Sequence, residues 1–181
     1  MASPVKIELA YSPYQELDME RYKNIKEDIL SRAQKREPLS TLPMQQYNLN
    51  GTDLRSFLAY AVGTFPESIA VELLIAIKEK LVVFSESDWK DVVSNVSIHK
   101  NAANRTLIHF FLFHTDAPVS FIEKIGLDTN SISNDFSNYY NETKKTFYSV
   151  LNGKNKSLYE KLQLTGAGLD LLKSIGTMSP E

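Results

Sequence analysis

The hydrophobic residues of this chain recur with the period of an α-helix rather than with the alternation of a β-strand. Near the N-terminus, Tyr22, Ile25 and Ile29 are three and four positions apart, and most of the residues between them are polar or charged. This spacing places the three side chains on one face of a helix and the charges on the other. We therefore expect an amphipathic helix over 12–35 that packs against the rest of the protein.

The middle of the chain predicts further helices with recognisable ends. A Gly-Thr-Phe-Pro-Glu stretch ends one helix and starts another, with Thr64 and Glu67 placed to form a capping box. The helix that follows is apolar in nearly every direction, so we expect it to be the central buried helix. A second capping signal, Ser85 with Asp88, precedes an apolar helical stripe that begins at Trp89.

The segment 104–130 predicts two short helices joined by a tight turn. Asn104 is placed to cap the first helix, Pro118 to open the second and Gly126 to end it. Beyond a polar loop, apolar residues of helical period predict a long helix that starts near Phe136. Since no stretch shows sustained alternation, the expected fold class is all-α, with about eight helices in helix-turn-helix pairs.

The chain divides into a main body and shorter flanking parts. Residues 36–50 contain two prolines and no sustained period, which is typical of a linker or of a loop that lies over the body. We expect an N-terminal helix and linker over 1–49, a helical main domain over 50–176 and a frayed tail over 177–181.

Similarity between two segments of the chain indicates a repeated unit in the main domain. The segment 56–62 is followed by a proline and an apolar helix, and 106–112 is followed in the same way about 50 residues later. Helical repeats are commonly roughly 33 to 47 residues long, so the spacing is a loose one. This internal similarity favours a short solenoid over a globular bundle.

Within the second unit, 106–109 (Thr-Leu-Ile-His) resembles the Thr-Pro-Leu-His opening of an ankyrin repeat, and 126–130 (Gly-Leu-Asp-Thr-Asn) resembles its ending. The resemblance implies a tight turn held by Thr106 and His109 before the first helix, and a second helix closed by Gly126. It covers about 27 of the 181 residues, as one degenerate repeat. The fold that it implies is a short degenerate ankyrin-like solenoid. The alternative is an irregular α-helical domain with one similar hairpin.

Composition and charge restrict the classes of function. Hydrophobic residues make up 43% of the chain and charged residues 23%, which are ordinary globular values, and the net charge is −2. Because no long basic run occurs, we expect neither a nucleic-acid nor an anionic-membrane partner, although a local basic patch can still form in three dimensions. The chain has no cysteine, which excludes disulfides, thiolate metal sites and cysteine nucleophiles.

Candidate catalytic and metal-binding residues are few. His109 and His114 are five positions apart, which does not match a helical zinc site. We expect His109 to hydrogen-bond the backbone at its turn. His114 and Asp116 have the residue types of a base and the group that orients it, but no motif supplies a nucleophile. We therefore predict no catalytic residue, no metal and no cofactor.

The leading hypothesis about function is based on the aromatic residues. The hairpin and the long helix that follows it hold more aromatic side chains than one thin core layer accommodates. Exposed aromatics at helical spacing are typical of interface hot spots, and we nominate Tyr139, Tyr148 and Trp89. The loops 99–104 and 127–133 are a second candidate contact surface. The hypothesis is a non-enzymatic protein-interaction module that binds another protein.

Two other hypotheses stay open. The first is an enzyme with an unrecognised polar site around His114 and Asp116, and the second is a structural subunit that forms a homo-oligomer through its N-terminal helix. No stretch matches a secretory signal or the ~20 apolar residues of a membrane-spanning helix, so we expect a cytoplasmic protein. Because the chain is rich in Asn, Lys, Ser and Ile, one version of the interaction hypothesis is a bacterial effector translocated into a host cell.

Overall fold

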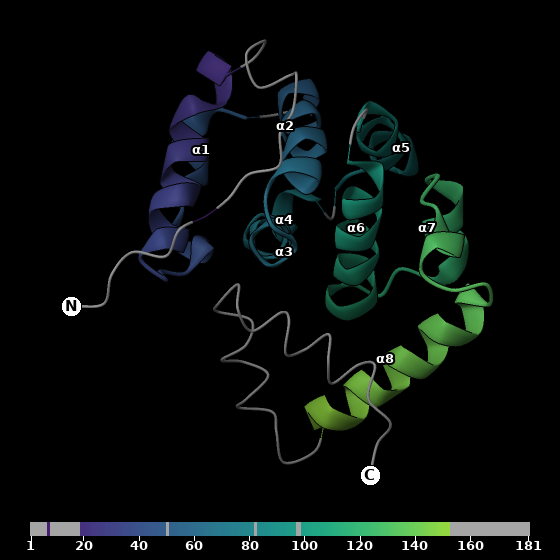
Figure 1. Ribbon diagram of the computed structural model, residues 1–181. Helices are drawn as coiled ribbons and strands as arrows, with labels where there is room; N and C mark the ends of the chain where they lie inside the picture. Colours follow the sequence, from purple (N-terminus) through teal and green to yellow (C-terminus); the bar gives the residue numbers. More distant parts are fainter. Residues whose placement is uncertain (1–6, 8–18, 50, 82, 97–98, 153–181) are drawn as a thin grey trace.

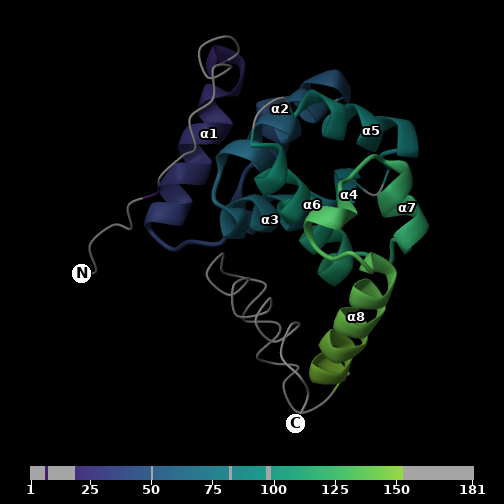
Figure 2. The same ribbon diagram turned by 45° about the vertical axis from the view of Figure 1, so that its right-hand side comes forward.

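The computed structural model describes residues 7, 19–49, 51–81, 83–96 and 99–152. These residues contain eight α-helices and no strand, so the expected all-α fold is confirmed. Figures 1 and 2 show α1 (Met19–Gln34) at one end of the described part and α8 (Phe136–Asn152) at the other. Between them lie α2 (Gly51–Thr64), α3 (Glu67–Ala76), α4 (Lys78–Leu81), α5 (Glu86–Asn95), α6 (Lys100–His114) and α7 (Val119–Lys124).

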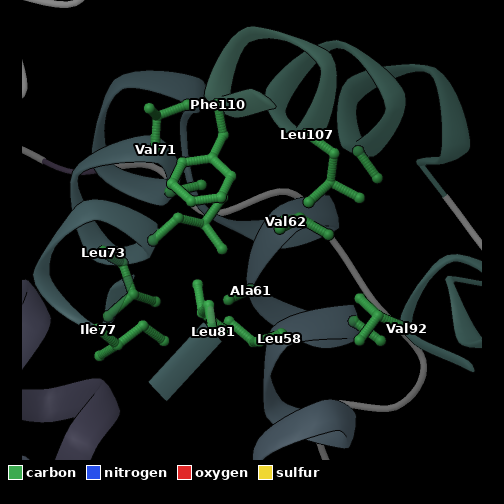
Figure 3. Close-up of a cluster of buried hydrophobic side chains, with 14 of the residues drawn as sticks. Leu58, Ala61, Val62, Val71, Leu73, Ile77, Leu81, Val92, Leu107 and Phe110 are labelled. Carbon is green, nitrogen blue, oxygen red and sulfur yellow. The ribbon is translucent and has the colours of Figure 1, made fainter. Parts of the chain in front are cut away.

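The core forms where α3 packs against α6, and where α2 packs against α5 and α6. Leu58, Val71 and Phe110, from α2, α3 and α6, meet in one apolar cluster (Figure 3). Residues 69–74 of α3 are all buried, as expected for a helix that is apolar in nearly every direction. Complete burial of a Leu or Phe side chain contributes about 1.5–3 kcal/mol relative to leaving it exposed, so this contact supplies much of the stability.

Helix α1 buries the face that its sequence period predicts. Tyr22, Ile25 and Ile29 are 5%, 1% and 0% exposed, and Ala33 is partly buried against the same core. The described part of this helix begins at Met19, and its expected first turns over 12–18 lie outside the described residues. The amphipathic pattern therefore identified the packing face correctly.

The described part of the expected linker, 36–49, lies over the body and contributes side chains to the core. It forms two 3₁₀ turns, Leu39–Thr41 and Met44–Tyr47, and it buries Leu39, Leu42 and Leu49. The first turn contacts both α1 and α3. The segment is therefore attached to α3 by buried leucines as well as by the continuity of the chain.

Two helical hairpins share the same construction. In the first, Pro66 with extended backbone precedes α3, and in the second, Pro118 with extended backbone precedes α7. The capping box expected from Thr64 and Glu67 is wrong, because no side chain caps α3. Thr64 is instead the last residue of α2 and is buried, and Glu67 contacts His109 on α6.

The capping box expected at the start of α5 is confirmed. The Ser85 hydroxyl accepts a hydrogen bond from the Asp88 N–H at 3.1 Å, and the Asp88 carboxylate accepts one from the Ser85 N–H at 2.9 Å. Arg55 on α2 also pairs with Asp88 and with Asp91, at N–O distances of 3.4 and 2.8 Å. The start of α5 is therefore held both by its own cap and by α2.

The expected start of α6 is wrong. The helix begins at Lys100, after His99 in the left-handed conformation, and the Ala103 N–H already donates to the His99 carbonyl at 3.0 Å. Asn104 therefore lies inside the helix, and so does the segment 106–109, where the ankyrin resemblance implies a turn. The physical reason is that the buried face of α6 includes Ala103, which lies upstream of the expected cap.

The end of α7 agrees with the sequence. Gly126 follows the helix with a φ of +93°, a conformation that glycine adopts without the penalty paid by other residues. The polar loop after it contains a 3₁₀ turn, Thr129–Ser131, capped by the Asp128 side chain. Helix α8 then buries Phe136 and Tyr140. The remaining predicted main domain, 153–176, and the tail over 177–181 lie outside the described residues.

Candidate functional site

An aromatic pocket of about 290 Å³ lies where four helices end or begin. It is bounded by α4, the start of α5, the C-terminal half of α6 and the residues that open α7. The residues that line it are Lys78, Leu81, Phe84, Trp89, Phe110, Phe111, Thr115, Ala117, Pro118 and Phe121. Half of these side chains are aromatic, so the pocket favours an apolar occupant.

Edge-to-face contacts fix the walls of the aromatic pocket. The rings of Trp89 and Phe111 are 4.9 Å apart with an angle of 74° between their planes. Phe84 meets Trp89 at 5.3 Å and 61°, and Phe121 meets Phe111 at 5.6 Å and 73°. Aromatic pairs prefer this geometry, because the positive ring edge faces the negative ring face. These contacts restrain the rings that form the walls.

A hydrogen-bonded loop supports the far side of the aromatic pocket. The Thr115 hydroxyl donates to the Phe111 carbonyl at 2.7 Å and accepts from the Ala117 N–H at 3.2 Å. From α8, the Tyr140 hydroxyl donates to the Ala117 carbonyl, and the Lys144 ammonium donates to the Thr115 carbonyl at 2.9 Å. These bonds join α8 to the segment between α6 and α7.

An exposed apolar residue precedes the lining residue Phe84 in the chain, and an exposed lysine belongs to the lining. Val83 is 77% exposed, which is unusual for a large apolar residue in the described part of the chain. It lies between Leu81 and Phe84, which both line the pocket. Lys78 is exposed and also lines it. The lining thus includes one positive charge, and an exposed apolar residue is the sequence neighbour of one of its aromatic rings.

His114 and Asp116, the candidate catalytic pair, occupy different environments. His114 is 5% exposed, and burial, together with the positive charge of Lys78, lowers the pKa of its imidazole to about 3. His114 is therefore neutral at physiological pH. Asp116 is exposed. Burial lowers the pKa of the half-buried Lys144, and the Asp116 carboxylate opposes that shift.

His109 contacts a carboxylate instead of the backbone at a turn. Its Nδ1 atom lies within hydrogen-bond distance of the Oε1 atom of Glu67, in the first turn of α3. The expected backbone contact is wrong, because His109 lies in the middle of α6 and is 7% exposed. The pair joins the two most closely packed helices, α3 and α6.

The three nominated aromatic residues have different surroundings. The expected exposure of Trp89 is wrong: this residue is 3% exposed, because it lies on the same helical stripe as Val92 and faces α6. Tyr139 is half-buried, its ring lies 6.1 Å from that of Phe136, and burial raises the pKa of its hydroxyl. Tyr148 belongs to α8, and its side chain lies outside the described residues.

A second cavity, of about 540 Å³, brings the two candidate loops together. Lys100, Asn101 and Asn104 from the start of α6 line one side, and Leu127 and Asp128 line another. The third side comes from α5. We call it the loop-tip cavity. The sequence nominated both loops, but no sequence signal indicated that they surround one cavity or that lysines from α5 and α7 contribute to it.

No group of three or more His, Asp or Glu side chains gathers closely enough to hold a metal ion in the residues that the structure describes. Within the same residues, no helix is both long enough and apolar enough to span a membrane. Comparison with family models, curated proteins and solved structures finds no match to this chain, so the ankyrin resemblance gains neither support nor contradiction from it.

Proposed function

We propose that this protein is a non-enzymatic helical interaction module that binds an apolar side chain of a partner protein in the aromatic pocket. The observation that carries the proposal is a pocket of about 290 Å³ whose lining is half aromatic. Interface hot spots are typically such pockets, since they release water around a large apolar anchor. Val83, which is exposed and precedes the lining residue Phe84 in the chain, extends the contact in this proposal.

The size and charge of the pocket define the partner's chemistry. Its volume of about 290 Å³ is at the lower end of the roughly 300–1,000 Å³ of small-molecule sites, which suits one bulky side chain. Lys78 at the rim favours an acidic neighbour next to that side chain. The expected ligand is a peptide segment with a Leu, Phe or Trp beside Asp or Glu.

The paired hairpins support the module hypothesis. The α2–α3 and α6–α7 hairpins are both opened at their second helix by a proline, and α6 packs against both helices of the first hairpin. Stacked hairpins of this kind form solenoids, which expose an extended binding surface. We therefore include a short solenoid-like arrangement in the proposal.

The geometry favours this proposal over the two alternatives. An enzyme that uses His114 requires substrate access to a side chain that is 5% exposed. Self-association through α1 requires an apolar face that the same chain already buries through Ile25 and Ile29. Both alternatives therefore need buried groups to become accessible, whereas the lining of the aromatic pocket includes the exposed Lys78 and the half-buried Phe121.

Peptide display tests the proposal. Selection of random 12-residue peptides on the folded protein is expected to enrich a large apolar residue beside an acidic one. Val83→Asp introduces a negative charge next to the lining residue Phe84 in the chain and is expected to weaken the binding of the selected peptides about tenfold or more. Asn141→Asp adds the same charge on the exposed face of α8 and serves as the matched control.

Two results would overturn the proposal. One is the absence of any enriched motif, and the other is equal binding of the selected peptides to Val83→Asp and to the wild type. A second variant, Phe121→Ala, removes a half-buried wall of the pocket. Its fold is checked by circular dichroism before its binding is measured.

A further inference from the structure

Charge distinguishes the loop-tip cavity from the protein as a whole. Lys90, Lys100 and Lys124 line it against a single carboxylate, Asp128, although the net charge of the protein is −2. The three lysines belong to α5, α6 and α7, so the fold gathers them and no local run of sequence does. A concave surface of one charge sign focuses the field and attracts ligands of the opposite sign.

The four charged groups differ in their availability. Lys90 pairs with Glu86 at an N–O distance of 3.9 Å. Lys100 and Lys124 are exposed, and neither takes part in an ion pair among the described residues. The Asp128 carboxylate already accepts a hydrogen bond from the Asn130 N–H at 3.1 Å within its own turn. Two ammonium groups therefore remain available to an anion in the cavity.

The start of α6 adds donors of another kind to the lysines. α6 has 15 residues, and its first residues, Lys100 and Asn101, line the cavity. His99 precedes the helix without a side-chain hydrogen bond to its N-terminal amides. Such amides carry partial positive charge and attract anions. Asn104, one turn further along, brings a side-chain amide that can donate.

We propose that the loop-tip cavity is a binding site for a small phosphorylated molecule. A phosphate group carries up to two negative charges and several acceptor oxygens, which match the donors that α6 and α7 contribute to the lining. A single carboxylate offers fewer acceptors and one charge. The phosphate group binds between Lys100 and Lys124, in front of the first turn of α6.

The remaining lining residues accommodate the carbon skeleton of the ligand. Val96, Leu107 and Ile125 are buried and present an apolar floor. The volume of about 540 Å³ falls within the range of small-molecule sites. None of the described residues that line the cavity is aromatic, so the site does not select a planar base by stacking. The site therefore suits a phosphorylated aliphatic compound or a sugar phosphate.

This site is separate from the aromatic pocket. The aromatic pocket lies at the C-terminal end of α6 and the loop-tip cavity at its N-terminal end. The two linings share no residue, although Leu107 and Phe110 lie one turn apart on α6, and the sequence neighbour of Val83 that lines a cavity, Phe84, belongs to the aromatic pocket. The Val83→Asp variant is therefore expected to bind phosphate compounds normally, and the failure of one proposal leaves the other unaffected.

Isothermal titration calorimetry with inorganic pyrophosphate tests the proposal on the full chain. At low ionic strength we expect a Kd of about 1 mM or tighter for the wild type, weakening as salt screens the lysines. The double variant Lys100→Gln, Lys124→Gln is expected to raise the Kd about tenfold. Either no binding by the wild type or an unchanged Kd in the double variant would overturn the proposal.

Two controls separate a defined site from general charge. Lys23→Gln, Lys145→Gln removes two exposed lysines of α1 and α8, which do not line the cavity, and is expected to bind pyrophosphate like the wild type. An equal loss in this control would overturn the proposal. Titration with citrate, which carries carboxylates only, is expected to give weaker binding. If citrate binds more tightly than pyrophosphate, the assignment of a phosphate ligand is wrong.

Discussion

The buried carboxylate of Glu72 accepts a hydrogen bond from the backbone N–H of Leu39 at 3.0 Å, across 33 positions of sequence. Glu72 is 7% exposed and Leu39 is 1% exposed. A buried backbone N–H without an acceptor is costly. The Glu72 carboxylate supplies the acceptor for the Leu39 N–H, at the start of the 3₁₀ turn Leu39–Thr41. This contact also explains why the central apolar helix α3 contains an acidic residue among its buried positions.

Replacement of this carboxylate is expected to destabilise the protein. Glu72→Ala leaves the Leu39 N–H buried without its acceptor, and we expect the free energy of unfolding to fall by about 1–3 kcal/mol. Glu72→Gln keeps an amide oxygen at the same place and is expected to lose less. Urea denaturation measures both. The control Glu123→Ala, at an exposed position of α7, is expected to stay within about 0.5 kcal/mol of the wild type.

Some local signals in the sequence predicted local structure, although the expected caps at Thr64 and at Asn104 were wrong. The start of α5 depends on Ser85 and Asp88, which are three positions apart, and the buried face of α1 depends on residues within one helix. Such features need no knowledge of the rest of the chain. This is why the helical class, the capping box and the end of α7 at Gly126 agree with the structure.

Contacts between residues that are far apart in the chain could not be predicted from the sequence. His109 meets Glu67 across 42 positions, and the two candidate cavities are assembled from residues of at least three helices each. Trp89 was nominated as exposed although it shares a stripe with Val92, and only the position of α6 decides that this stripe is buried. Helical period identifies a face, but the partner of that face is a property of the whole fold.

The cap of α5 gives a second stability prediction. Ser85→Ala removes the hydroxyl that accepts from the Asp88 N–H, and we expect a loss of about 0.5–2 kcal/mol in the free energy of unfolding. Ser87→Ala, in the same turn but at an exposed position, is expected to be neutral or slightly stabilising, because alanine favours the helix. Thermal unfolding followed by circular dichroism compares them. Equal melting temperatures for the two variants would contradict the role of the cap.

The burial of His114 predicts a loss of stability in acid. Burial and Lys78 lower the pKa of its imidazole from 6.5 to about 3 in the folded protein, whereas the unfolded chain keeps a value near 6.5. Between these values the unfolded state binds one more proton at this residue, so stability falls as the pH drops below about 6.5. One proton corresponds to ~1.36 kcal/mol per pH unit, which gives a loss of about 2 kcal/mol between pH 7 and pH 5.

Urea denaturation at several pH values measures this contribution. His114→Gln cannot take up the proton, so its free energy of unfolding is expected to change less between pH 7 and pH 5 than that of the wild type. The comparison uses the slope against pH, which does not depend on the overall stability of the variant. Parallel slopes for the two proteins would show that His114 is protonated as readily in the folded as in the unfolded state.

The attachment of α8 gives a last prediction. This helix packs against α6, and its Tyr140 hydroxyl and Lys144 ammonium donate to carbonyls of the segment that follows α6. Tyr140→Phe removes one donor from the carbonyl of the half-buried Ala117, which is expected to cost about 0.5–1.5 kcal/mol in local stability. Because α8 lies at one end of the described part (Figure 1), we expect this cost to favour local opening of α8 over global unfolding.

Hydrogen exchange followed by mass spectrometry separates local opening from global unfolding. In Tyr140→Phe, amides of α8 are expected to exchange several-fold faster, while those of α3 and α6 keep their protection, because α3 and α6 form the core independently of this bond. Asn141→Ala, at the next and exposed position, is the matched control and is expected to leave both regions unchanged. If α3 and α6 lost protection together with α8, the helix would instead belong to the same cooperative unit as the core.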